Sequence, residues 1–342
     1  MGNEVRRALP VVIYNKKEIT TEISGYIKSL EIVDNLEGQF DSMKMTLINK
    51  NNDFMNESWS FEKGETISYA LRTLNWEHEL EGIKEAGMGV YYVDEKEYTK
   101  ESAVIKGISA PLEATDVVHS KTWASISLKR LGEEIAKKYK LKYSYLLSKE
   151  INLSNLMQEK ETDFSYLDKV AADEGIKVKV SFNTLILFDE EEYAKKESVA
   201  TLDLNKVADF KLTDKNKDIY DAVEVSYFDT IAFADKRKIV TEAELRGKGK
   251  GTAKKVLKLK GKSRSGDLKR YALKKLEQAN KRQIELEITD VGNRYLYAGC
   301  TFNIINSGTF NGKYMITQIT KKLPGFVMKI KSYKVKSLEE EK

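Results

Sequence analysis

The sequence predicts a mainly-β chain that carries a small α/β insert near its middle. Apolar and polar residues alternate with period two over much of residues 10–115 and again near the C-terminus, which is the pattern of strands with one buried face. Helical periodicity is concentrated in about 115–190. Long alternating strands with few helices favour antiparallel sheets closed into barrels or sandwiches. The 342 residues suffice for two or three domains.

The first β region contains a series of alternating strands. Residues 27–34 and 41–49 alternate cleanly, and residues 65–74 and 102–112 follow the same pattern. Between the last two, residues 75–100 are rich in Glu and Lys and contain three glycines. That composition is typical of a hairpin tip or a long exposed loop.

The period changes near residue 122. Residues 123–141 place four apolar side chains on one helical face, with Glu–Lys pairs four residues apart. Thr122 or Ser125 is the expected N-cap. These features predict an amphipathic helix that opens the insert.

A second helix is predicted over residues 161–175. Thr162 or Asp163 is placed to cap it, and an apolar stripe follows. Gly175 stands at its end, where a left-handed residue is favoured. We therefore expect the insert to hold two helices.

The remaining elements are mostly strands. An alternating hairpin follows the second helix and turns at Asn183-Thr184, and residues 221–229 form another strand. A helix is predicted around residues 266–281. The C-terminal part is all-β, with Asn311-Gly312 as a type I′ hairpin signal.

Few residues are available for metal or nucleophilic chemistry. Cys300 is the only cysteine, which excludes an intramolecular disulfide and a cysteine-cluster metal site. The two histidines, His78 and His119, belong to no recognisable motif, so we interpret them as ordinary surface or boundary residues. No window approaches 18 consecutive apolar residues, so we expect no membrane span. No cofactor and no metal are predicted.

The sequence also lacks complete phosphate-binding and calcium-binding motifs. Gly261-Lys262-Ser263 resembles the end of a Walker A motif, but Val256 stands where its first glycine is required. The glycines near residue 249 lack the dinucleotide-binding pattern. The acidic run 189–192 has no calcium-loop spacing, and we interpret it as a solvated turn.

The strongest compositional feature is a basic segment, residues 246–275. It contains 13 Lys and Arg and a single acid, a local net charge of +12. Because the whole chain carries +5, the other residues together carry −7. The segment either contacts phosphate or another acidic surface, or it is an exposed loop leading into a helix with a lysine-rich wet face. Its candidate contact residues are Lys248, Lys250, Lys254, Lys255, Lys258, Lys260 and Lys262.

Three stretches, taken in order, resemble the late control protein D family, the baseplate hub proteins of contractile-tailed phages and phage-tail-like bacteriocins. The hub part of type VI secretion spike proteins is similar. The first stretch spans residues 29–71, the second 158–180 and the third 283–320. The residues that carry the resemblance are Asp41, Phe61, Gly64, Gln158, Asp163, Phe164, Leu167, Gly175, Gly312 and Tyr314.

The resemblance implies two tube-like antiparallel β-barrels and a small α/β domain. The first barrel would span residues 1–114 and take strands from about 200–232. The α/β insert would span 115–199. The second barrel, with the basic loop and helix, would span 233–342.

The resemblance also implies a structural role without catalysis. Three chains would form a ring whose six barrels match a hexameric tail tube above and a three-fold spike below. The implied partners are two further copies of the chain, the tail tube protein, a separate spike protein and other baseplate proteins. The protein would be made in the bacterial cytoplasm and assembled into a phage or tail-like particle.

Two other functions compete with the hub. The chain could bind nucleic acid through residues 246–275, with a steep salt dependence, although a single aromatic residue in that segment disfavours base stacking. It could also be a cell-wall hydrolase, which would need a carboxylate pair or metal site that the sequence does not reveal.

Overall fold

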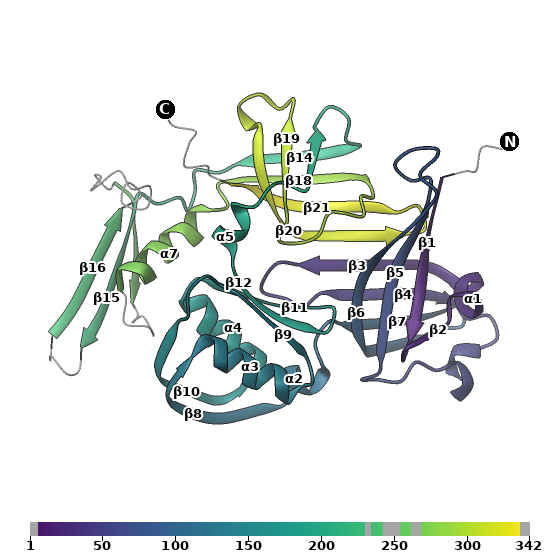
Figure 1. The fold of residues 1–342 in the computed structure, drawn as a ribbon, viewed down its shortest axis with the longest axis horizontal. Coiled ribbons are helices and arrows are strands. Elements are labelled where there is room, and N and C mark those ends of the chain that lie inside the picture. The colour runs from purple at the N-terminus through teal and green to yellow at the C-terminus, as the bar shows by residue number, and fades with distance from the viewer. Residues whose placement is uncertain (1–5, 230–233, 242–253, 261–267, 336–342) are drawn as a thin grey trace.

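The computed structural model describes residues 6–229, 234–241, 254–260 and 268–335 (Figure 1). Within these ranges the protein is mainly β, with large antiparallel sheets and a helical insert, so the predicted fold class is confirmed. The described residues pack into four apolar cores, which belong to two β-rich halves, the insert and a small unit built around one helix.

The first half runs from β1 to residue 108 and pairs its strands in the order β3-β4-β7-β6-β5-β1-β2. Alternate side chains, such as Leu30, Met45 and Ile67, form its core, as the period-two pattern predicts. The short helix α1 spans Thr20–Ile23. Its strands are β1 (Arg7–Tyr14), β2 (Lys17–Glu18), β3 (Ile27–Asn35), β4 (Ser42–Ile48), β5 (Thr66–Leu74), β6 (Ile83–Tyr98) and β7 (Ser102–Ile108).

Strand β6 differs from the sequence prediction. Most of residues 75–100, expected as a loop, form a 16-residue strand that pairs with both β5 and β7. Both ends of the strand are largely exposed, which explains the Glu and Lys content that suggested a loop. Hydrogen bonds to β5 and β7, rather than a buried face, hold those ends in the sheet.

The second half consists of β13 (Ala200–Asp203), β14 (Asp209–Asp214), β18 (Ile284–Val291), β19 (Thr301–Ile305), β20 (Gly312–Leu323) and β21 (Val327–Lys334). Strand β20 pairs with β3, so both halves share one 13-stranded sheet although each keeps its own core. The predicted transfer of residues 200–232 to the first barrel is wrong. Strand β13 pairs with β19 and β14 pairs with β18, inside the second half.

The type I′ turn expected at Asn311-Gly312 does not form. Residues 306–311 form a longer connection between β19 and β20, with a 3-10 turn at Gly308–Phe310. Asn311 has a φ of −53°, whereas a type I′ turn needs positive φ at both central residues.

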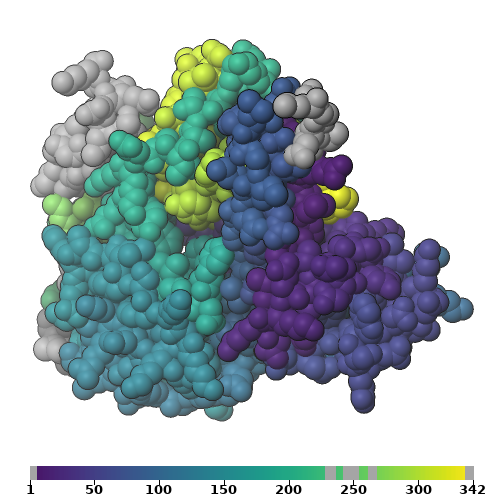
Figure 2. All heavy atoms as spheres, turned by 45° about the vertical axis from the view of Figure 1, so that its right-hand side comes forward, coloured from purple at the N-terminus to yellow at the C-terminus, as the bar shows by residue number. Residues whose placement is uncertain are grey.

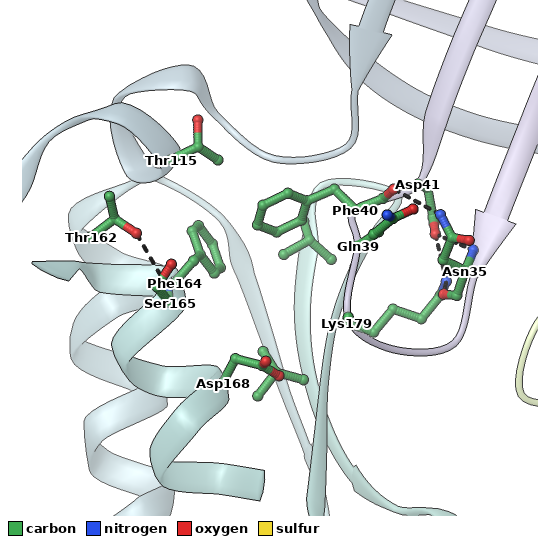
Figure 3. Close-up of a pocket in the computed structure, with 13 residues that line it drawn as sticks. Asn35, Gln39, Phe40, Asp41, Thr115, Thr162, Phe164, Ser165, Asp168 and Lys179 are labelled. Carbon is green, nitrogen blue, oxygen red and sulfur yellow. Dashed lines mark hydrogen bonds and ion pairs between the residues drawn. The ribbon is translucent and has the colours of Figure 1, made fainter.

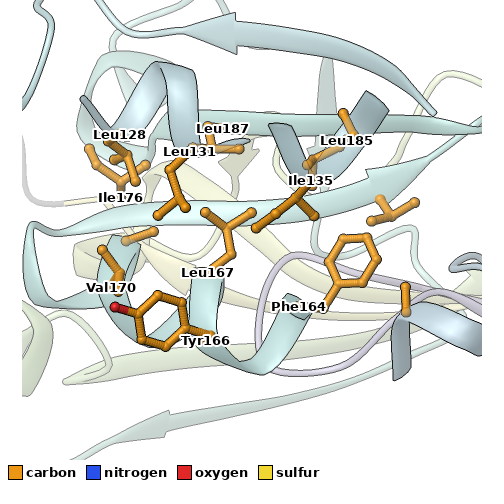
Figure 4. Packing of buried hydrophobic residues seen from close by; sticks show 14 of the residues in the cluster. Leu128, Leu131, Ile135, Phe164, Tyr166, Leu167, Val170, Ile176, Leu185 and Leu187 are labelled. Atoms are coloured by element: carbon orange, nitrogen blue, oxygen red, sulfur yellow. The ribbon is translucent and has the colours of Figure 1, made fainter. Parts of the chain in front are cut away.

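The insert packs two helices between two small sheets, as Figure 1 shows and Figure 4 details for its core. Its elements are α2 (Leu112–Asp116), β8 (Val118–Ser127), α3 (Leu128–Lys138), β9 (Lys142–Leu146), β10 (Asn152–Thr162), α4 (Asp163–Asp173), β11 (Ile176–Ser181), β12 (Thr184–Asp189) and α5 (Glu190–Ala194). Strand β8 pairs with β10, and β12 lies between β11 and β9.

Helix caps explain where the insert helices begin. Thr162 caps α4 as predicted, because its hydroxyl accepts a hydrogen bond from the backbone N–H of Ser165. Helix α3 begins later than expected. Residues 123–127 belong to β8, and Ser127, not Thr122 or Ser125, is the cap. The hairpin between β11 and β12 turns at Phe182 and Asn183, both at positive φ, one residue before the predicted position.

A fourth unit was not expected. Strands β15 (Ala222–Asp229), β16 (Ala234–Thr241) and β17 (Val256–Lys260) form a separate sheet covered by helix α7 (Leu268–Asn280). We name these four elements the α7 unit. The predicted helix at 266–281 therefore exists, but it covers this sheet and not the sheet of the second half. None of the helices in the described ranges has the length and hydropathy needed to cross a membrane.

Candidate functional site at the junction of the halves and the insert

The first half, the second half and the insert lie against one another (Figure 2). They meet around the loop that connects β3 to β4. The ammonium group of Lys179, on β11, lies 2.6 Å from a carboxylate oxygen of Asp34 and 2.8 Å from one of Asp41. The other carboxylate oxygen of Asp34 accepts a hydrogen bond of 2.9 Å from the backbone N–H of Ala298 in the second half. Asp34 therefore links all three parts of the chain, and we name Asp34, Asp41 and Lys179 the junction triad.

Asp41 also holds the loop itself in place. Asp41 Oδ1 accepts a hydrogen bond of 2.9 Å from the backbone N–H of Asn35, and the backbone N–H of Asp41 donates to Ser109 Oγ at 3.1 Å. Lys179 also donates to the Asn35 carbonyl. Figure 3 shows the lysine side chain reaching from β11 to this loop. These contacts fix the loop in place, and the one from Lys179 comes from the insert itself.

A small pocket lies beside the triad (Figure 3). Phe40 and Phe164 form part of its wall and meet edge to face, with ring centroids 5.4 Å apart. Its volume of about 160 Å³ is below the usual range of about 300–1,000 Å³ for small-molecule sites. The geometry is that of a packing contact between the insert and the first half, and it offers little room for a substrate.

Burial raises the pKa of Asp41 to about 7, and the nearby charge of Asp34 adds to this effect against the attraction of Lys179. An acid whose pKa is higher in the folded state binds its proton more tightly there, so its contribution to stability falls as pH rises from about 4 through 7. We expect Asp41→Asn to remove this dependence while keeping an oxygen acceptor.

The measurement is urea denaturation of both proteins from pH 4.5 to pH 8. Relative to Asp41→Asn, the unmodified chain should lose stability across this range by at least about 1.4 kcal/mol, the free energy of one pKa unit. Parallel stability curves would show that Asp41 titrates as it does in the unfolded chain.

A second ionic cluster lies next to the triad. Lys177, Lys281 and Tyr333 converge on the carboxylates of Glu37 and Glu190. Burial opposes the charge of Glu37, but Lys281 and Lys177 outweigh burial and lower its pKa to about 2. The cluster joins the β3–β4 loop, the insert, helix α5 and strand β21.

The acidic run 189–192 is therefore only partly solvated, and its prediction as a solvated turn is wrong. Glu190 is 8% exposed, and Asp189 caps α5 by accepting a hydrogen bond from the backbone N–H of Glu191. Lysine contacts neutralise Asp189, Glu190 and Glu191, which is why much of this charged segment can be withdrawn from water.

Trp76 makes a further contact between the halves. Its indole N–H donates a hydrogen bond of 2.7 Å to the carbonyl of Gly292, and its ring lies 5.1 Å from that of Phe326. Beside it, Arg294 of the second half binds Glu81 of the first. The pKa of Glu81 is lowered to about 2, chiefly by the hydrogen bond from Arg294.

The structure brings some of the family-motif residues together. Gln158, Asp163, Phe164 and Leu167 meet in the insert. Asp163 accepts hydrogen bonds from Gln158 at 2.9 Å, Lys138 at 2.6 Å and Tyr139 at 2.7 Å. Phe164 and Leu167 belong to the insert core. Phe164 contacts the ring of Phe40, which precedes Asp41 in the chain, and all three line the pocket beside the triad.

The other motif residues lie apart from one another. Each either packs in an apolar core or has a backbone angle that favours glycine. Phe61 packs in the first half against Tyr14, and Gly64 has a φ of +83°. Tyr314 is buried in the second half, where its hydroxyl donates to the Phe310 carbonyl. Gly312 and Gly175 both have positive φ, at +134° and +77°, as glycine readily allows. A Cβ on Gly175 would also come within 2.8 Å of Lys274.

The residues suited to chemistry are scattered. Cys300 is buried in the second half, where burial raises the pKa of its thiol to about 11. His119 lies 3.9 Å from Asp163, in the insert, and His78 is in the loop after β5. Among the described residues, no group of three His, Cys, Asp or Glu side chains is placed to hold a metal ion.

The basic segment is described only in part. Lys248, Lys250 and Lys262 lie outside the described residues. Lys254, Lys255, Lys258 and Lys260 are exposed on or beside β17. Further along, Lys274 and Lys275 are paired with acids, so part of the positive charge is already neutralised within the chain.

The sequence did not point to Lys177, Lys179, Asp34, Glu37 or Glu190 as junction residues. Lys177 and Lys179 alternate with valines on β11, a pattern of one buried and one wet face. Both faces of β11 are covered, since the lysine face packs against the β3–β4 loop. The sequence signal for this junction was a pair of strand lysines and an acidic turn of the opposite charge.

The likeness of this chain to known proteins lies in its fold. No family model matches the sequence, and no curated protein matches it. Among solved structures, the chain is similar to a tail protein from Neisseria meningitidis, with a TM-score of 0.71 and 12% identity over 96% of this chain and 97% of that one.

Two further structures extend this likeness. The prophage MuSo2 43 kDa tail protein from Shewanella oneidensis has a TM-score of 0.69 and 14% identity over 96% of this chain and 98% of that one. An E. coli component of the type VI secretion system has a TM-score of 0.55 and 9% identity over 98% of this chain and 78% of that one. The chain therefore has the fold of tail proteins and of this secretion-system component along nearly its whole length.

Proposed function

We propose that the chain is a structural hub in the baseplate of a contractile tail or tail-like injection particle. In this role it adapts a six-fold tail tube to a three-fold spike. The observation that carries the proposal is the end-to-end likeness to tail proteins, which covers 96% of this chain and 97% of the Neisseria protein. A shared fold alone leaves function open, so the internal architecture must supply further support.

That support is the pairing of two β-rich halves in one chain. Each half has its own apolar core, yet strands β3 and β20 join them in a single sheet. Three such chains would present six β-rich halves, which matches a six-fold neighbour while the subunits keep three-fold symmetry. The β3–β20 ladder, the junction triad and Trp76 would hold the halves at a fixed mutual angle.

The junction also favours a structural role over catalysis. Its charged side chains are paired with each other or with backbone groups, and the adjacent pocket is small. In this chain we infer that the paired, buried charges fix the mutual geometry of the parts that they join. An adaptor needs that geometry, because its partners meet it on fixed symmetry axes.

The proposal is tested by native mass spectrometry of the purified chain, alone and mixed with the spike protein of the same particle. We expect a species of three times the chain mass, at least in the presence of the spike. A chain that remains monomeric under both conditions would contradict the hub.

The competing function is tested in the same preparation. Binding to a DNA duplex with a steep salt dependence, lost when Lys254, Lys255, Lys258 and Lys260 are changed to Gln, would support nucleic-acid binding. We expect no shift of the duplex at moderate ionic strength.

A further inference from the structure

The α7 unit has an apolar core of its own. Val223, Val225 and Val240 from its sheet pack against Ala272 and Leu276 of α7. Among the described residues, every member of this core comes from the unit, and the other three cores take no member from it. The unit is therefore not joined to the rest of the chain by a shared apolar core.

The opposite side of α7 is held by ion pairs. Lys274 Nζ lies 2.8 Å from Glu191 Oε1 and 3.6 Å from Asp189 Oδ2. Lys281 directly follows the last residue of α7, and its Nζ lies 2.9 Å from Glu37 Oε1 and 3.0 Å from Glu190 Oε2. The acids belong to the β3–β4 loop and to α5 with its cap.

Further polar contacts join α7 to the end of helix α4. Lys275 Nζ lies 3.9 Å from Asp173 at the end of α4, and a guanidinium nitrogen of Arg270 donates to the Glu174 carbonyl at 3.5 Å. Next to them Gly175 gives room for the stem of Lys274, because a Cβ there would lie 2.8 Å from its Cδ. Charged and polar groups thus line this contact from the start of α7 to its end.

We propose that the α7 unit is a movable arm, held against the insert by an ionic latch of Lys274 and Lys281 with Asp189, Glu190, Glu191 and Glu37. An arm held by apolar packing would expose its core when it moves. This arm keeps its core whole and gives up ion pairs and polar contacts, so a charged partner that competes for these groups can release it. The inference does not depend on the hub function.

The latch lysines are only 15% and 12% exposed at their side chains. Salt screens such partly buried pairs weakly, so charge replacement is the sharper test. In Lys274→Glu/Lys281→Glu, acids would face acids at every main contact of the latch, and repulsion would drive the arm away. In Lys274→Met/Lys281→Met, the attraction is lost but the side-chain stems remain.

The experiment measures the distance between spin labels at Lys254→Cys, two residues before β17 of the arm, and Glu133→Cys, on helix α3. Both positions are exposed, whereas Cys300 is 4% exposed and its pKa is raised to about 11, so it should stay unlabelled. Double electron–electron resonance should give one narrow distance distribution in the otherwise unchanged chain. The control variant is Lys260→Glu/Lys269→Glu, which makes the same charge change at exposed positions of the same unit.

The Glu variant should move the larger part of the distribution to longer distances, the Met variant should broaden it, and the control should leave it narrow. Circular dichroism spectra and thermal melting of each variant show whether it is folded. A narrow distribution in both the Glu and the Met variants would overturn the latch. So would equal broadening in the control, because net charge rather than these contacts would then set the position of the arm.

Discussion

Lys179→Met should destabilise the folded chain by about 3–5 kcal/mol at pH 8, the cost typical of removing one partner from a buried ion pair. Lys179 is 11% exposed at its side chain and lies within 2.8 Å of both Asp34 and Asp41. Methionine keeps the apolar stem but leaves two carboxylates facing each other. Urea denaturation followed by circular dichroism measures the loss.

The pH dependence separates electrostatics from packing. Protonation relieves the repulsion between the two acids, so the cost of Lys179→Met should be smaller at pH 5 than at pH 8. Lys44→Met is the matched control at an exposed position of strand β4 and should change stability by less than about 0.5 kcal/mol. A cost for Lys179→Met that is equal at both pH values would mean that the side chain acts through packing alone.

Trp76→Ala should cost about 3–5 kcal/mol, as large-to-small changes of buried aromatic residues do. Trp76 is 7% exposed, packs on Phe326 and satisfies the Gly292 carbonyl across the boundary between the halves. The variant therefore removes an anchor between the halves, in addition to apolar burial within the first one.

Hydrogen exchange read by mass spectrometry locates that effect. Peptides covering residues 74–83 and 291–296 should both lose protection in Trp76→Ala. Trp59→Ala serves as the control, because Trp59 packs against Tyr26 and Phe54 inside the first half and should leave residues 291–296 protected. Loss confined to residues 74–83 in Trp76→Ala would show that the tryptophan does not couple the halves.

Local elements were the part of the fold that sequence reasoning predicted well. The α4 stripe with Thr162 as cap and Gly175 beyond its end depends on neighbours in the sequence, and all three features are present. The hairpin of β11 and β12 likewise depends on local alternation, and its turn moved by a single residue.

Elements that depend on distant partners were harder to predict. Residues 123–127 look helical by periodicity, but Trp123 and Ile126 pair with Leu156 and Leu153 of β10, and this pairing makes them a strand. Likewise, β13 and β14 carry no signal for which sheet edge they join. Strand partners are chosen by contacts far apart in the chain, so tertiary pairing overrides local propensity.

The junction was missed for a related reason. A lysine in an alternating strand normally lies on the wet face, and nothing near Lys179 in the sequence reveals Asp34 or Asp41 as its partners. The motif residues Asp41 and Phe164 did mark both sides of this contact, although their joint surroundings became visible only in three dimensions.

The most direct test of the hub is electron microscopy of the purified chain with the spike protein, analysed as two-dimensional class averages. We expect rings with three-fold symmetry, a central opening and six β-rich lobes, two from each chain. Averages that show single copies, or closed rings of another symmetry, would contradict the account, because two halves per chain give six lobes only in a trimer.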